Sequence, residues 1–136
     1  MSSFEILPHT ADLRLKVSGD SPEELFRAAV KGMASIIKRD ACKNRAEIKK
    51  KISLSSDDRT TLLIDFLSEA LTLSQTDRIV FCNVNFEKLT ETELTGEILG
   101  TKVNEFDEDI KAVTYHEANV VRNEKGRWET TIIFDI

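Results

Sequence analysis

The segment DSPEELFRAAVKGMASIIKR, residues 20–39, decides the fold of this 136-residue chain because it carries the signals of a long amphipathic helix. The hydroxyl of Ser21 can accept a hydrogen bond from the third amide of the helix, Pro22 suits the first helical position, and Glu24 completes a capping box. An apolar stripe follows at helical spacing, formed by Phe26, Ala29, Val30, Met33, Ile36 and Ile37. We therefore predict a helix that buries this stripe.

A second amphipathic helix is predicted over about residues 57–73. Ser56 can cap it, and Asp57 and Asp58 favour the positive N-terminal end of the helix dipole. Its apolar face consists of Leu62, Leu63, Phe66, Leu67, Ala70 and Leu71. Both helices thus have one apolar side to bury.

Most of the remaining sequence alternates apolar and polar residues, as half-buried strands do. The predicted strands cover residues 12–17, 47–54, 79–86, 93–101, 110–121 and 127–136. The last two flank RNEKG, residues 122–126, whose Asn and Gly suit a short hairpin loop, so we expect these strands to pair antiparallel.

The order of the predicted elements is strand, helix, strand, helix and then several strands, which is typical of the α+β class. We expect a two-layer sandwich in which two amphipathic helices cover one face of a mainly antiparallel sheet. No repeat, low-complexity tract or linker divides the chain, so residues 1–136 are predicted to form a single domain.

The composition limits the function. The chain has 24 acidic and 19 basic residues, a net charge of -5, which argues against a surface that binds a phosphate backbone directly. We therefore expect no DNA binding and only an indirect role with RNA. Neither a signal peptide nor a run of about 18 apolar residues is present, so we expect a soluble cytoplasmic protein without membrane contact. Cys42 and Cys82 lack a short metal-ligand spacing, and we expect reduced thiols.

The familiar catalytic motifs are missing from the sequence. There is no glycine-rich phosphate loop, no GxSxG, no HExxH and no Cys/His cluster, and the two histidines are His9 and His116. Among the acids, Asp12 closes PHTAD where the first alternating strand begins, a position from which a side chain can face a ligand. Short polar side chains at such a position usually hydrogen-bond local backbone, and His9 taken alone is more often structural than a ligand or base.

Asp135 belongs to the final stretch IIFDI. It alternates with Ile133 on one face of the predicted strand, while Ile132, Phe134 and Ile136 take the other face, so we expect a half-buried acid that needs a partner. A Lys or Arg would satisfy it. A divalent cation would do the same and could also engage the main-chain carboxylate of Ile136; oxygen ligands of this kind favour Ca²⁺, Mg²⁺ or Mn²⁺ over Zn²⁺.

Taken together, four stretches resemble the archease family. They are HTADLRLKVSGDSPEELFRAAVKGM at 9–33, LLIDFLSEAL at 62–71, GEIL at 96–99, and IKAVTYHEANV at 110–120 with the final IIFDI. The resemblance covers nearly the whole chain in the right order. Its most specific anchors are HTAD, the KAVTYH strand and the terminal Asp-Ile.

The resemblance implies a compact α+β protein that assists an RtcB-type RNA ligase in tRNA splicing and RNA repair. The ligase joins RNA ends through a covalent guanylylated histidine of its own. The helper is an activator and not an enzyme: it promotes formation of that intermediate and restores turnover, with a metal ion delivered or arranged in the ligase site. The family's metal site falls on Asp12, Asp135 and the terminal carboxylate of Ile136.

A functional lysine is also associated with the family, and either Lys102 or Lys111 occupies its place. Lys111 lies inside the better-matched KAVTYH segment, but a solvated or ion-paired strand lysine explains it as well. Glu97 in GEIL is a weaker candidate for a supporting role near the metal, the alternative being an ordinary exposed strand acid.

Two other functions are weighed against ligase activation. One is a chaperone or specificity modulator of other enzymes such as RNA methyltransferases, which has also been proposed for the family. The other is an independent metal-dependent hydrolase, which is disfavoured because the sequence offers no second metal site and no clear base. The acidic charge of the chain is compatible with a basic ligase as partner.

Overall fold

The computed structural model describes residues 2–7 and 12–136. Its elements are β1 Ser3–Leu7, β2 Asp12–Gly19, α1 Pro22–Ile37, the 3-10 helix η1 Ala41–Lys43, β3 Ile48–Ser55, α2 Arg59–Asp77, β4 Ile79–Leu89, β5 Glu93–Lys102, β6 Ala112–Thr114, β7 Val121–Arg122 and β8 Trp128–Asp135. Neither helix of the described chain is long and apolar enough to cross a membrane.

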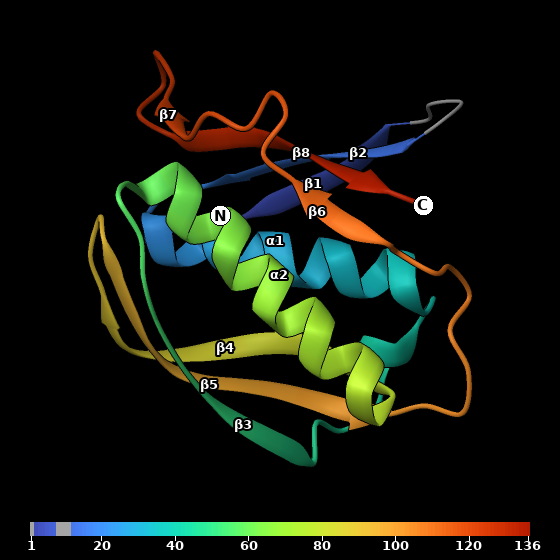
Figure 1. Cartoon of the computed structure of the whole chain (residues 1–136). Helices are drawn as coiled ribbons and strands as arrows, with labels where there is room; N and C mark the ends of the chain where they lie inside the picture. The colour runs from blue at the N-terminus through green and yellow to red at the C-terminus, as the bar shows by residue number, and fades with distance from the viewer. Residues whose placement is uncertain (1, 8–11) are drawn as a thin grey trace.

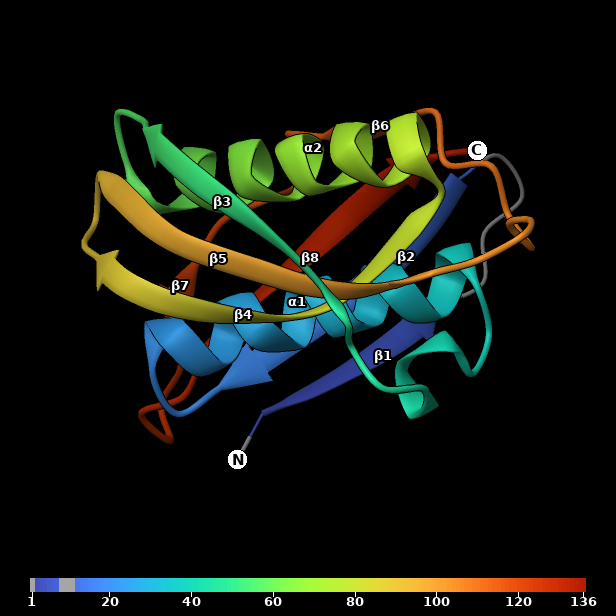
Figure 2. The ribbon, with the colours of Figure 1, turned by 90° about the horizontal axis from the view of Figure 1, so that it is seen from below.

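The strands form two antiparallel sheets with both helices between them (Figures 1 and 2). One sheet has the order β1-β2-β8-β6 with β7 also paired to β8, and the other has the order β3-β5-β4. The α+β class and the antiparallel pairing are confirmed. The layering differs from the expected single sheet with helices on one face, because each helix contacts strands of both sheets and buries side chains toward each.

The α1 helix forms as its sequence predicts. The hydroxyl of Ser21 accepts a hydrogen bond from the amide of Glu24 at 3.2 Å, Pro22 opens the helix, and the whole predicted stripe is buried. Gly32 faces β2 so closely that an added Cβ would lie 2.6 Å from Cδ2 of Leu15. The close approach of α1 to the first sheet therefore depends on this glycine.

The α2 helix begins and ends later than predicted. Its N-cap is Asp58, whose carboxylate accepts from the amide of Thr61 at 2.7 Å, and this hydrogen bond lowers the pKa of Asp58. The prediction that Ser56 caps this helix is therefore wrong, because the hydroxyl of Ser56 donates to Asp65 instead. At the other end the helix continues to Asp77, and Arg78 stops it in a left-handed conformation with φ 55°.

The last third of the chain departs most from the predicted strands. The single strand expected over 110–121 is wrong: β6 and β7 are separate short strands, and Glu117 between them has φ 58°. The amides of Asn119 and Val120 bond to the hydroxyls of Thr130 and Thr60 instead of to a strand. The hairpin is confirmed, since β7 pairs antiparallel with β8 around a turn in which Gly126 has φ 78°.

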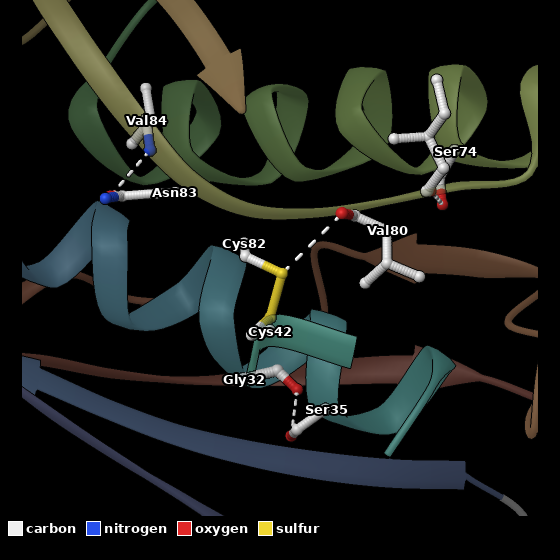
Figure 3. Close-up of a disulfide and its surroundings, with 9 residues drawn as sticks. Gly32, Ser35, Cys42, Ser74, Val80, Cys82, Asn83 and Val84 are labelled. Carbon is white, nitrogen blue, oxygen red and sulfur yellow. Dashed lines mark hydrogen bonds between the residues drawn. A yellow bond between two sulfur atoms is a disulfide. The ribbon is translucent and has the colours of Figure 1, made fainter. Parts of the chain in front are cut away.

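A disulfide joins Cys42 to Cys82, so the expectation of reduced thiols is wrong (Figure 3). The two cysteines are 40 residues apart in sequence, but η1 packs against β4 and brings their Cα atoms within 5.5 Å. Sequence spacing could not show this proximity, because it arises only when β4, which comes later in the chain, packs against η1.

Candidate functional site

Asp12 and Asp135 lie directly opposite one another in the antiparallel pair of β2 and β8. The register that joins them is set by the apolar residues beside them, since Leu15, Ile132 and Phe134 are fully buried toward the helices. Residues paired across two strands share one face, so both carboxylates lie on the outer face of the first sheet. Two like charges in this position repel each other, and a bound cation would relieve the repulsion.

Asp135 is exposed and Asp12 is partly buried. The expectation of a half-buried Asp135 is therefore wrong, and its neighbour on the same face shows why. Ile133 is only 6% exposed and pairs with Arg14 of β2, which reaches across to Glu117 in an ion pair of 2.7 Å. Ile133 thus lies inside the strand, whereas Asp135 is its last residue.

Lys111 lies beside the aspartate pair. Its backbone amide donates to the carbonyl of Asp135 at 2.8 Å, and the next residue, Ala112, pairs with Asp135 in the sheet. Ile136 follows Asp135 and packs partly buried against the core. Four of the predicted site residues thus come from the neighbouring ends of β2, β8 and β6.

The remaining predicted residues do not join this group. Glu97 lies on β5 of the second sheet, between Lys51 and Asn85, and Lys102 ends the same strand opposite Ile79. That sheet is on the other side of the helices from Asp12 and Asp135 (Figure 1). His9 lies outside the described residues.

The donors at the aspartate pair suit a hard cation. Residues 2–7 and 12–136 contain no group of three or more His, Cys, Asp or Glu side chains arranged to hold a metal. A cation bound here would therefore take carboxylate oxygens from Asp12 and Asp135 and complete its shell with other oxygen donors, as Ca²⁺, Mg²⁺ and Mn²⁺ do.

A second polar cluster was not predicted. The hydroxyl of Tyr115 donates to one oxygen of Asp65, and the hydroxyl of Ser56 donates to the other at 2.7 Å. The hydrogen bond to Asp65 raises the pKa of Tyr115, and desolvation and the negative charge of Asp65 act in the same direction. The signal in the sequence is an acid inside the apolar run LLIDFL, a run that predicts a helix and contributes to the family resemblance without a role for Asp65.

The chain matches the model of the Archease protein family (MTH1598/TM1083) over residues 4–136. It is 33% identical over 141 residues to protein archease of Methanosarcina mazei, an alignment that covers 98% of this chain and 95% of that protein. It is 31% identical over 147 residues to protein archease of Pyrococcus furiosus, with 100% of both chains covered.

Two solved structures share the fold. The solution structure of Methanobacterium thermoautotrophicum protein 1598 superposes with a TM-score of 0.80 at 28% identity and covers 98% of each chain. The crystal structure of a Thermotoga maritima protein described as an archease and possible chaperone superposes with a TM-score of 0.66 over 96% of this chain and 94% of that one. At 20% identity, the second likeness concerns the fold alone.

Proposed function

The chain belongs to the archease family, and on this premise we propose that it is a metal-binding accessory protein that activates an RtcB-type RNA ligase. In this role it promotes guanylylation of the ligase and multiple turnover in tRNA splicing and RNA repair, without a reaction of its own. The observation that carries the proposal is the direct cross-strand pairing of Asp12 with Asp135.

Asp12 and Asp135 would hold a divalent cation, Ca²⁺, Mg²⁺ or Mn²⁺, with the carboxylate of Ile136 as a third ligand. Such a cation supplies positive charge that can offset the phosphates of a bound nucleotide. The β2–β8 register supports this assignment because it keeps the two carboxylates together without any flexible loop between them. Lys111, bonded through its amide to Asp135, is the lysine that we assign to the function.

The partner is the ligase, and RNA is reached only through it. A net charge of -5 suits an electropositive ligase surface and does not suit direct contact with DNA or RNA. We place this interaction in the cytoplasm, away from membranes.

Multiple-turnover RNA ligation with an RtcB-type ligase tests the proposal. We expect Asp12→Asn and Asp135→Asn each to abolish stimulation while circular dichroism shows an intact fold. Glu124→Gln is the matched control, because Glu124 is an exposed acid of the β7–β8 loop. Full stimulation by both aspartate variants would refute the site assignment.

The two lysines form a second matched pair. Lys111→Ala should reduce stimulation and Lys102→Ala should not, because only Lys111 lies beside the aspartate pair. The reverse result would assign the functional role to Lys102, which lies on the second sheet.

The alternative function is that of a chaperone or a specificity modulator of other enzymes, such as RNA methyltransferases. The observation that favours it is the presence of exposed apolar side chains on the described surface, Phe4 and Ile6 among them. A protein of this class should suppress client aggregation or alter methylation when no ligase is present, and Asp12→Asn should leave that effect unchanged.

A further inference from the structure

The outer edge of β1 is open within the described chain. β1 pairs with β2 along its whole length, and no described strand pairs with its other side (Figure 2). Its sequence, SFEIL, contains none of the Lys or Pro residues that usually protect an edge strand from pairing. The edge therefore offers backbone N–H and C=O groups to another extended segment.

One face of this edge strand is apolar and only partly covered. Phe4 is 39% exposed and Ile6 is 40% exposed. They pair with Val17 and Leu15 of β2, which are fully buried, so Phe4 and Ile6 also point to the helix side of the sheet. Because β1 is the edge strand, no described strand of this sheet lies over the adjacent surface of α1.

A groove of about 280 Å³ lies beside this face. Its walls are Phe4 of β1, Lys31 and Ser35 of α1, Lys38 and Asp40 from the segment after α1, and Cys42 and Lys43 of η1. A strand added along β1 would place every second side chain over this groove, because side chains alternate between the two faces of a sheet.

The charge of the groove is basic, in contrast to the acidic chain as a whole. Lys38 is paired with Asp107 at 3.2 Å and Lys43 with Asp40 at 3.3 Å. Lys31 is exposed and makes no ion pair with any residue of 2–7 and 12–136. An acidic side chain in the groove could therefore form an ion pair with Lys31.

We propose that the edge of β1 and this groove bind an extended segment of a partner protein, added to the sheet as a further strand. The segment carries apolar side chains at alternate positions, which pack on Phe4 and Ile6, and at one further position of the same face it carries an acidic side chain that pairs with Lys31. This inference goes beyond ligase activation and does not depend on the metal.

A second copy of this chain fits the groove less well. If β1 of another copy paired with β1 in a continuous sheet, its helix-facing residues would again be Phe4 and Ile6, and its Glu5 would point to the opposite face. Such a copy brings no acid to Lys31. The charge therefore favours a different protein as the occupant.

Fluorescence anisotropy with the full chain tests the proposal. The probe is a labelled peptide in which every second residue, on the face that meets the groove, is valine except for one glutamate, with threonine at the positions between them. Its control has lysine in place of the glutamate. We expect only the acidic peptide to bind and to slow hydrogen exchange of the β1 amides. Lys31→Glu should weaken binding about fivefold or more. Lys125→Glu, the same charge change in the exposed β7–β8 loop, should have no effect.

Ile6→Lys should abolish binding, because it places a charge on the apolar face of the edge strand. Equal binding by Lys31→Glu and Lys125→Glu would overturn the charge assignment, and failure of the acidic peptide to bind the wild-type chain would overturn the proposal. A concentration-dependent dimer that Ile6→Lys disrupts, without peptide binding, would assign the edge to a second copy. No ligase is present in any of these measurements, so their failure is separate from a failure of the proposed function.

Discussion

Tyr115 donates a hydrogen bond from its hydroxyl to Asp65, and this contact ties the end of β6 to the middle of α2. It is the hydrogen bond that raises the pKa of Tyr115 above its ordinary value of 10.0. The neutral hydroxyl is favoured in the folded state. The stabilisation is therefore fully present below the ordinary pKa and is lost as the pH rises through the raised one.

We predict that the free energy of unfolding falls above about pH 10 and that Tyr115→Phe removes this part of the slope. Tyr115 is the single tyrosine of the chain, so an absorbance titration of the phenolate reports it alone. The folded protein should titrate at higher pH than the protein in denaturant. Asp65→Asn should bring the folded value back toward the denatured one, and identical curves for folded and unfolded protein would contradict the prediction.

Calcium, magnesium or manganese should raise the thermal stability of the wild-type chain. A ligand that binds only the folded state adds about 2.7 kcal/mol when its concentration is 100 times its dissociation constant. Because the cation requires both carboxylates, Asp12→Asn and Asp135→Asn should show no metal-dependent shift, and Glu124→Gln should shift like the wild type. Differential scanning calorimetry with and without EDTA measures the effect. A shift that survives in both aspartate variants would place the cation elsewhere.

An extension after Ile136 should weaken metal binding and ligase stimulation. The added peptide bond turns the carboxylate of Ile136 into an amide, which keeps one oxygen and loses the charge. An extension of equal length at the N-terminus is the control. Ile136 packs against the core, so thermal unfolding of both versions is measured alongside activity. Equal stimulation by folded versions of the two would leave Ile136 as a buried strand end only.

Reduction of the Cys42–Cys82 disulfide should lower the free energy of unfolding. Closing a loop of this length restricts the unfolded chain and contributes roughly 2–4 kcal/mol. Denaturant titrations with and without a thiol reductant measure the loss, and Cys42→Ser should behave like the reduced wild type in both. Cys42 is the exposed partner, so reductant can reach the bond without unfolding. Unchanged stability on complete reduction would show that the bond adds nothing to the fold.

The helices and most strands could be predicted from the chain because their causes are local. The α1 helix is specified within a few turns by Ser21, Pro22 and its apolar stripe. The alternation of apolar and polar residues that indicates β2 or β8 lies within a single strand. The start of α2 was predicted less well, since Ser56 and Asp58 are both good caps and only the hydrogen bond of Ser56 to Asp65 decided between them.

For the candidate site too, some features follow from the sequence and others only from the tertiary structure. Strand position and family resemblance pointed to Asp12 and Asp135 and left the functional lysine open between Lys102 and Lys111. Pairing between β2, β8 and β6 places Asp12, Asp135 and Lys111 together. Only the tertiary structure separated Lys102 and Glu97 from them, joined Cys42 to Cys82, and left the edge of β1 open beside Lys31. The physical reason is that helix caps and strand periodicity depend on neighbours in the chain, whereas pairing, layering and cover depend on residues that meet only after the chain has folded.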